Sequence, residues 1–143
     1  MRILILNWRD INNPSSGGAE ILTHEMAKRW VKEGHEVTQL SSRFRNSLEK
    51  EIIDGVKIVR MGTWWSVQML AFFYYLVHLR GRVDVVIDEV HFFPFFAALY
   101  VKEKTTLLVC EVANKLFFEL LPYPLALIGR AVEKFYLILY KNI

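Results

Sequence analysis

Two adjacent glycines, Gly17 and Gly18, have the residue type and the position suited to binding an anion. They lie near the end of the loop NWRDINNPSSGGAE, which follows the apolar run Ile3 to Leu6 and leads into an amphipathic stretch. Because glycine has no Cβ, a ligand can approach the backbone closely, and amide groups at a helix N-terminus can donate hydrogen bonds to phosphate oxygens. The same pair would also suit a tight turn, and the dipeptide alone leaves both interpretations open.

Polar and titratable side chains follow two of the later apolar runs. Asp88, Glu89 and His91 stand at the end of one run, and Cys110 and Glu111 stand at the end of another. If these runs are parallel strands, their carboxyl ends meet at one edge of the sheet, beside the glycine loop. A carboxylate near a histidine can act as an acid, a base or a hydrogen-bond partner toward a hydroxyl group, so Glu89, His91 and Glu111 are the candidate catalytic residues. Any one such side chain is more often structural, and Cys110 is most simply a small buried hydrophobic residue.

The apolar runs predict the elements that position these residues. Near-continuous apolar runs are typical of parallel strands buried on both faces, and here they alternate with segments of helical period. Asp54-Gly55 between β-branched residues is a strong hairpin signal. We therefore expect an α/β fold, a Rossmann-like parallel sheet with helices on both faces, formed by residues 1–143 as a single domain. The expected strands are 2–7, 36–41, 51–53, 56–60, 84–88 and 105–110, and the expected helices are one that follows Gly18, 65–79 and 124–140.

Two segments carry more specific expectations about burial. In the helix that follows Gly18, the face expected to pack on the sheet has Ala19, Leu22, Met26 and Trp30 on one stripe, with Thr23, Ala27 and Val31 beside them. The segment from Phe92 to Tyr100 is apolar throughout, and its Pro94 is compatible with the first turn of a helix.

The composition excludes several classes of protein. The single cysteine allows no internal disulfide, no Cys and His cluster has zinc-ligand spacing, and we expect no metal. The apolar stretch 64–79 is shorter than the roughly 20 residues that span a bilayer, and the N-terminal run is too short for a signal peptide. The net charge of +3 comes from scattered Lys and Arg, which does not indicate a nucleic-acid platform. We therefore expect a cytoplasmic protein.

The absence of several known catalytic motifs argues against further types of chemistry. The glycine loop lacks G-x-G-x-x-G, and the chain has neither a P-loop pattern nor G-x-S-x-G. Cys110 has no evident activating base nearby in the sequence. Dinucleotide-binding, P-loop and hydrolase interpretations are therefore poorly supported.

Four short motifs follow one another along the chain. They are N-P-x-x-G-G-A-E from Asn13, K-x-G-H-E-V-T from Lys32, D-G-V-x-I-x-R from Asp54 and D-V-V-I-D-E-V-H from Asp84. In this order they resemble the N-terminal half of family 4 of the retaining glycosyltransferases, and the similarity covers essentially the whole chain. G-H-E-V-T also occurs in other Rossmann-like folds, but the ordered set with G-G-A-E is fairly specific.

The resemblance implies one half of a GT-B architecture, in which two Rossmann-like domains face each other across a cleft. Gly17 and Gly18 would then contact the diphosphate of a nucleotide-sugar donor, which is a substrate, and no metal or other cofactor is implied. The acceptor would be a sugar or a lipid-linked compound with a reactive hydroxyl group. Its contacts would come from strand-end residues, namely Asp88, Glu89, His91 and Cys110.

Two departures from the family pattern limit this interpretation. Cys110 stands where members often carry a histidine, and a thiol cannot do the work of an imidazole. The C-terminal domain, with the paired glutamates of the donor site, is not among these 143 residues, so we expect a truncated or split half that is inactive alone. Two other classes stay open: a non-catalytic binding or assembly module of the same fold, and a flavodoxin-like binder of nucleotide or flavin.

The apolar excess of the chain has two explanations. Hydrophobic residues make up 53% of the sequence and aromatic residues 14%. Many family relatives modify lipid-linked acceptors, which favours a peripheral, lipid-facing patch at the cytoplasmic membrane face. The other explanation is burial in the core or against the second domain. The residues expected in such a patch are Trp64, Trp65, Phe72, Phe73 and Tyr74, with Arg80 and Arg82 nearby.

Overall fold

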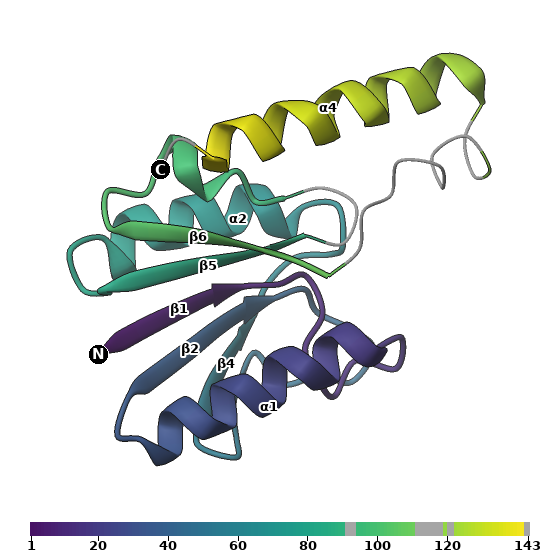
Figure 1. Cartoon of the computed structure of the whole chain (residues 1–143). Helices are drawn as coiled ribbons and strands as arrows, with labels where there is room; N and C mark the ends of the chain where they lie inside the picture. The colour runs from purple at the N-terminus through teal and green to yellow at the C-terminus, as the bar shows by residue number, and fades with distance from the viewer. Residues whose placement is uncertain (91–93, 111–118, 120–121, 142–143) are drawn as a thin grey trace.

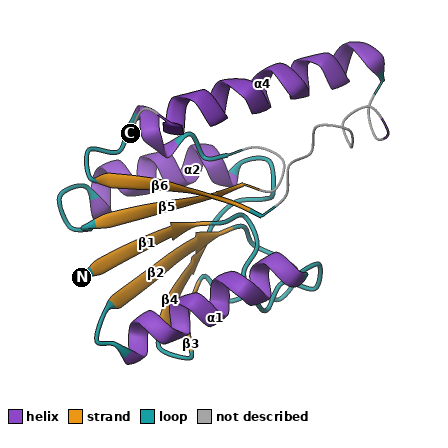
Figure 2. Cartoon of the chain, in the orientation of Figure 1, coloured by secondary structure: helices purple, strands orange, loops and turns teal. Residues whose placement is uncertain are grey.

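A six-stranded sheet forms the centre of the domain (Figures 1 and 2). The computed structural model describes residues 1–90, 94–110, 119 and 122–141. The strand order is β3-β4-β2-β1-β5-β6, and every neighbouring pair is parallel except the β3–β4 hairpin. The predicted α/β, Rossmann-like fold is thereby confirmed. The strands are β1 (Arg2–Leu6), β2 (Glu36–Ser41), β3 (Lys50–Ile53), β4 (Val56–Arg60), β5 (Val85–Val90) and β6 (Lys104–Val109).

The order of the strands changes direction at β1. The chain first adds β2 and β4 on one side of β1, and later adds β5 and β6 on the other side. In open α/β sheets the crevice beyond the carboxyl ends of the strands at such a switch point is the usual ligand site. The glycine loop starts from the carboxyl end of β1, so it lies at this point of the sheet.

Helices lie on both faces of the sheet (Figure 1). Helix α1 (Gly18–Lys32) contacts β2 and β4 on one face. Helix α2 (Val67–Tyr74), continued by the π-helical turn η1 (Tyr75–Leu79), covers the other face. The short 3-10 turn η2 (Ala97–Leu99) and helix α4 (Tyr123–Lys141) complete the described helices. The helices predicted at 65–79 and 124–140 are therefore confirmed to within two residues at each end.

The core has two layers because side chains alternate along each strand. On β1, Ile3 and Ile5 belong to the apolar cluster beneath α1, together with Ala27 of that helix. Leu4 and Leu6 belong to the cluster beneath α2. Burial of each such aliphatic side chain contributes about 1.5–3 kcal/mol to folding, so the central strand stabilises both layers.

The predicted burial of α1 is wrong at Leu22, whose side chain is 52% exposed. Thr23 and Ala27 of the predicted face are buried, and so are Glu20 and His24, which the apolar pattern did not include. Polar groups tolerate burial when they are hydrogen-bonded, and each of these three polar side chains finds a partner that lies elsewhere in the fold. The buried face is consequently shifted from Leu22 toward Glu20 and His24, whereas Thr23 and Ala27 are buried as the pattern predicts.

The segment after β5 is not a continuous helix in its described part, residues 94–100. Phe96 has φ +53°, in the left-handed region, and only Ala97–Leu99 forms a helical turn. The Asp88 carboxylate accepts hydrogen bonds from the amides of Phe95 and Ala97, which replace the bonds that a helix would provide. The first two residues of the predicted segment, Phe92 and Phe93, lie outside the described residues.

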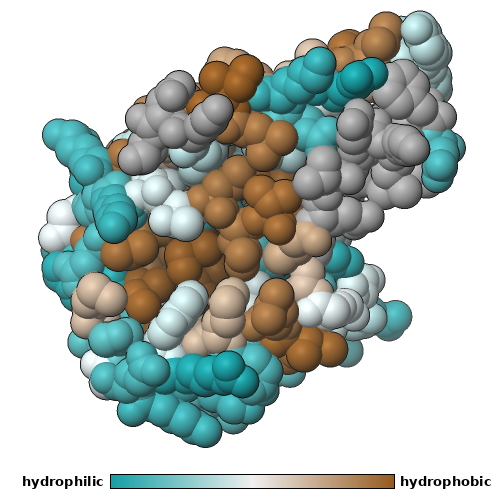
Figure 3. Space-filling view, in the orientation of Figure 1, coloured by the Kyte–Doolittle hydropathy of each residue, from teal (hydrophilic) through white to brown (hydrophobic). Residues whose placement is uncertain are grey.

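Part of the apolar excess lies at the surface. Figure 3 shows apolar side chains gathered between α1 and α4, beside hydrophilic side chains along α1. On the α1 side of the sheet, Ile87 and Leu108 are only half-buried. Among the described residues, no helix is long and apolar enough to cross a membrane.

Candidate functional site

The two glycines of the loop have different surroundings. Gly17 caps α1 in an extended conformation, and its amide N–H donates a hydrogen bond of 2.6 Å to the Glu20 carboxylate. Gly18 is the first residue of the helix, and a Cβ built on it would meet nothing within 4 Å. The Gly18 backbone is thus open to a ligand, whereas the Gly17 amide already has a partner within the loop.

Arg9 adds positive charge beside these glycines, and the sequence analysis did not select it. Its Nε donates to Glu20 at 2.9 Å, and its Nη1 donates to the carbonyl oxygen of Ser15 at 2.6 Å. The guanidinium also stacks on the Trp8 ring, 4.4 Å from its centroid. Because Arg9 is ion-paired with the buried Glu20 carboxylate in the first turn of α1, its positive charge beside the helix N-terminus is largely compensated. In the sequence, Arg9 was visible as an arginine in the loop after the first strand.

Glu89 joins β5 to α1 on the α1 face of the sheet. Its carboxylate is fully buried and accepts hydrogen bonds from Asn7 Nδ2 at 2.8 Å and Thr23 Oγ1 at 2.7 Å. The Cys110 thiol donates to it at 3.4 Å, so the structure brings together two of the predicted residues, Glu89 and Cys110. Asn7 and Thr23 were missed because a polar residue within an apolar pattern gives no sign of a distant partner.

Burial raises the pKa of the Cys110 thiol to about 12, and the neighbouring Glu89 carboxylate adds to this shift. A thiolate is the nucleophilic form of cysteine, and a thiol with such a pKa keeps its proton near neutral pH. Cys110 therefore acts here as a hydrogen-bond donor, as its hydrogen bond to Glu89 indicates.

Asp88 lies on the opposite face of the sheet from Glu89, because consecutive side chains of a strand alternate. It is fully buried and accepts hydrogen bonds from the amides of Phe95 and Ala97, both at 2.9 Å, and from the Tyr140 hydroxyl. Burial raises its pKa to about 6, although these hydrogen bonds act in the opposite direction. In the structure Asp88 thus fixes the segment after β5 and the end of α4, and it is not brought together with Glu89.

Two predicted site residues, His91 and Glu111, lie outside the described residues. Their catalytic or acceptor-binding roles, like those of Glu89, Asp88 and Cys110, stay predictions. Within the ranges that the structure describes, no group of three or more His, Cys, Asp or Glu side chains is placed to hold a metal ion.

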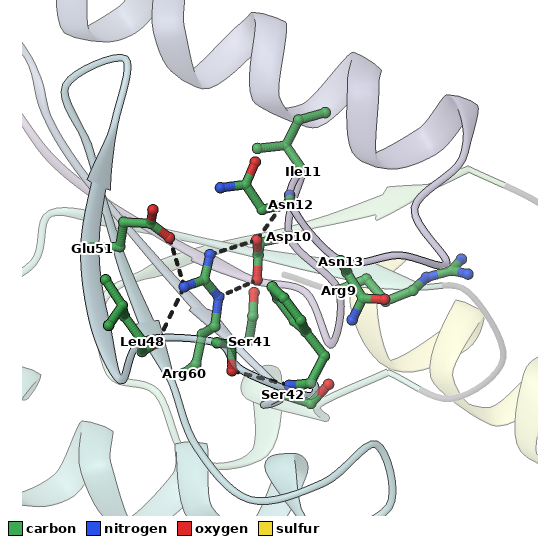
Figure 4. A network of polar contacts seen from close by, with 12 residues as sticks. Arg9, Asp10, Ile11, Asn12, Asn13, Ser41, Ser42, Leu48, Glu51 and Arg60 are labelled. Atoms are coloured by element: carbon green, nitrogen blue, oxygen red, sulfur yellow. Dashed lines mark hydrogen bonds and ion pairs between the residues drawn. The ribbon is translucent and has the colours of Figure 1, made fainter.

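A buried ionic network lies beside the glycine loop (Figure 4). Arg60, the last residue of β4, donates from Nε and Nη2 to the two oxygens of Asp10, at 2.7 and 2.8 Å. Its Nη1 donates to the Glu51 carboxylate at 2.7 Å and to the Leu48 carbonyl oxygen at 3.1 Å. Both Arg60 and Asp10 are buried. The arginine was visible in the sequence as the end of D-G-V-x-I-x-R, but its partner 50 residues away was not.

The fold and the loop geometry together define a Rossmann-like α/β domain whose first helix begins at the topological switch point, an arrangement suited to phosphate-bearing ligands. The model of Glycosyltransferase Family 4 matches residues 16–136, which is most of the chain. The chain belongs to this family, and the resemblance noted from its motifs is confirmed. A search of curated proteins finds no match to it.

Proposed function

We propose that this chain is the N-terminal, acceptor-side domain of a retaining glycosyltransferase with the GT-B arrangement. The complete enzyme would move a sugar from a nucleotide-sugar donor to a hydroxyl acceptor, and a second domain would hold most of the donor. The observation that carries this proposal is the open Gly18 backbone at the switch point of a family 4 domain. Because the other half of the donor site lies in the second domain, we expect no sugar transfer by the 143-residue chain alone.

The chemistry of the donor side follows from charge. When the glycosidic bond to a nucleotide diphosphate breaks, negative charge accumulates on the leaving phosphate. Amide groups at the start of α1 would stabilise this charge, since fixed donors are most effective where charge develops. The Arg9 guanidinium would contribute less, because its charge is already paired with Glu20. The nucleotide sugar is the substrate, and the proposal includes no metal or other cofactor.

The acceptor side of the proposal is built around Glu89. Asn7, Thr23 and Cys110 hold its carboxylate in one orientation. With His91 and Glu111 following the two neighbouring strands, this cluster would orient the acceptor hydroxyl or receive its proton. The Cys110 thiol can donate a hydrogen bond but cannot serve as a base. Any proton transfer would therefore involve Glu89, His91 or Glu111.

A titration with inorganic pyrophosphate tests the phosphate contact directly. We expect the backbone amide signals of Gly18 and Ala19 in a ¹⁵N-labelled chain to shift on addition of pyrophosphate, while signals at the opposite end of α1 stay in place. Shifts that are spread evenly over the surface, or that avoid the loop, would contradict the proposal. Sugar transfer after addition of a family 4 donor domain would further distinguish an enzyme from a non-catalytic module of the same fold.

A lipid-linked acceptor is supported by an exposed apolar ridge on α2 and η1. We define the ridge as Trp65, Met69, Phe73 and Val77, whose side chains are 53–72% exposed. Residues four apart lie on one face of an α-helix, so Met69 and Phe73 of α2 lie on the same side; Val77 follows on η1, and Trp65 precedes α2 by two residues. Such a ridge can enter the interfacial region of a bilayer, where tryptophan side chains are especially favourable.

Cations lie at the end of this ridge. Arg80 and Arg82 follow η1 and are exposed, which suits an anionic lipid surface. Two aromatic residues predicted for the patch have other surroundings: Phe72 packs against the Tyr100 ring at 4.9 Å, and Tyr74 is half-buried. The exposed Trp64 adjoins the ridge at its N-terminal end.

Sedimentation with vesicles of neutral and anionic phospholipids at low salt tests this membrane contact. We expect Phe73→Ser to weaken vesicle binding and Ile52→Ser to leave it unchanged, because Ile52 is an even more exposed apolar residue, but it lies on β3, outside the ridge. No binding by the unmodified chain, or equal losses in the two variants, would contradict the membrane contact. Such a result would favour a ridge that meets a protein partner, as in the assembly-module alternative.

A further inference from the structure

We propose that Arg60 is a positioning residue that fixes the loop leading to Gly18, although Arg60 lies on β4. Its guanidinium binds Asp10 of the loop with two hydrogen bonds and Glu51 of the β3–β4 hairpin with a third (Figure 4). The hairpin and the loop are thereby joined through one side chain. The inference rests on the proposed function only in its last step, the contact between Gly18 and phosphate.

Asp10 is a fixed point of the loop because its side chain cannot leave Arg60 at low cost. The side chains of Arg60 and Asp10 are both 0% exposed, and removing one partner of a buried ion pair leaves an uncompensated charge. Hydrogen bonding to Asp10 raises the pKa of Arg60 above its ordinary value, although burial acts in the opposite direction. The guanidinium therefore stays charged and keeps its two-pronged contact with the carboxylate.

From Asp10 onward, consecutive hydrogen bonds define the loop. The Asp10 carboxylate accepts from the Asn12 amide, and the Asp10 carbonyl oxygen accepts from the Asn13 amide, both at 3.0 Å. Asn13 then accepts from Ser15 through its side chain at 2.9 Å and from Ser16 through its carbonyl oxygen at 2.8 Å. The backbone position of each turn depends on the one before it, and the last turn ends next to the glycine pair.

Contacts of the residues that precede Asp10 do not position the loop in the same way as the Arg60–Asp10 pair. Ser42 donates twice to the Trp8 carbonyl oxygen, and Gln39 donates to the Arg9 carbonyl oxygen, so these bonds hold the two residues before Asp10. The Arg9 side chain reaches the Ser15 carbonyl oxygen and adds a contact to this part of the loop, but it is 18% exposed, whereas the Arg60–Asp10 pair is fully buried. The chain between residues 10 and 16 is thus oriented mainly from Asp10.

Hydrogen exchange in two matched variants of the 143-residue chain tests the inference. Asp10→Asn and Glu51→Gln each neutralise one carboxylate that binds Arg60, with almost no change of side-chain size. Only Asp10 lies in the loop. We expect Asp10→Asn to accelerate exchange of the loop amides by about tenfold or more relative to the amides of β1 and β2. Glu51→Gln should leave this ratio unchanged. The loop amides to follow are those of Asn12, Asn13, Ser15 and Ser16.

Arg60→Lys provides a second test, because lysine keeps the charge but cannot make the two-pronged contact. It should reproduce the exchange pattern of Asp10→Asn. The inference is overturned if the loop amides accelerate no more than the strands, or if Glu51→Gln accelerates them equally. Loss of folding in both Asp10→Asn and Arg60→Lys would also overturn it, since the network would then support the whole domain rather than the loop.

A pyrophosphate titration of the same variants connects the loop to binding. We expect Asp10→Asn to lower the affinity for pyrophosphate, measured from the shift of the Gly18 amide signal, by about tenfold. Glu51→Gln should leave this affinity unchanged. If the two variants have the same melting temperature, a difference between their affinities cannot come from a global loss of stability. If the unmodified chain shows no pyrophosphate shift, the proposed phosphate contact fails, whereas the exchange measurements still decide the role of Arg60.

Discussion

Gly18→Ala should separate phosphate binding from folding. Gly18 is the first helical residue of α1, its φ is not positive, and an added Cβ would meet nothing within 4 Å. Replacement of glycine by alanine in a compatible conformation stabilises a protein by about 0.4–1 kcal/mol, mainly through the unfolded chain. The variant should therefore unfold at the same or slightly higher urea concentration.

The same methyl group should weaken anion binding. Cα–Cβ bonds of a helix tilt toward its N-terminus, so the new methyl group would occupy the space in which a phosphate approaches the first amides. Loss of one hydrogen bond to a charged group costs about 1.5–3 kcal/mol, which corresponds to a dissociation constant roughly 10- to 150-fold larger.

Gly17→Ala is the matched comparison for this experiment. Its Cβ would lie 3.6 Å from the Glu20 carboxylate, an ordinary contact, and its amide is already bonded to that carboxylate. Titration of both variants with inorganic pyrophosphate should show a large loss of affinity for Gly18→Ala and a change of less than about threefold for Gly17→Ala. Equal affinities in Gly18→Ala and the unmodified chain would refute the role of Gly18. A loss confined to Gly17→Ala would show that Glu20 moves away and that Gly17 binds the anion.

Three further outcomes are expected in solution. Gly55→Ala should destabilise the domain by roughly 2–4 kcal/mol in urea unfolding, and Gly34→Ala by only about 1, because both have φ +85° but only at Gly55 does the new Cβ lie 2.6 Å from Val31. The pKa of Asp88 is raised to about 6 from 3.8, so its ionisation opposes folding; between about pH 4 and pH 6 the unfolding free energy should fall by up to roughly 3 kcal/mol as pH rises, and Asp88→Asn should lack this decrease. With its pKa raised to about 12, Cys110 should react with a thiol reagent at pH 8 much more slowly in the native than in the urea-unfolded chain.

Hydrophobic pattern and turn chemistry were sufficient to predict the framework. The bounds of β2 and β4 agree with the predicted strands, and the turn between β3 and β4 falls at Asp54-Gly55, where both residues have positive φ. These elements are defined by local rules, because a strand needs an apolar run and a tight turn needs residues that accept a left-handed backbone. The parallel order of the central strands then follows from the alternation of strands and helices.

Burial of polar side chains could not be predicted in the same way. The apolar stripe of α1 favoured burial of Leu22, which is exposed; the buried polar side chains are those of Thr23, which flanks the predicted stripe, and His24, which the pattern did not select. Their partners are Glu89 and Asp54, which lie 66 and 30 residues further along the chain. A periodic pattern counts apolar residues and contains no information about such distant partners, so it misplaces one side of the buried face of the helix.

The candidate site was predicted in part for the same reason. Glu89 and Cys110 do meet, because neighbouring parallel strands β5 and β6 end at one edge of the sheet. Asp88 is adjacent in sequence but faces the opposite layer, as the period of two along a strand requires. Proximity to a strand end therefore identifies the edge of the sheet at which a residue lies. The face on which its side chain lies depends on whether its position along the strand is odd or even.

Arg60 shows why a charged residue can serve this sheet edge better than an apolar one. Replacement of a buried ion pair by well-packed apolar side chains is often neutral or stabilising, so the network does not have to exist for stability. Apolar contacts are non-directional, whereas the planar guanidinium accepts only a few arrangements of the Asp10 carboxylate around it. A loop that must hold amide groups for a phosphate needs this directional control, because an error of about 1 Å in a binding group lowers its effect severely. In the proposed site, the buried arginine and the exposed glycine have complementary roles. Arg60 fixes the backbone of the loop, and Gly18, which has no Cβ, keeps the backbone amides accessible to a phosphate.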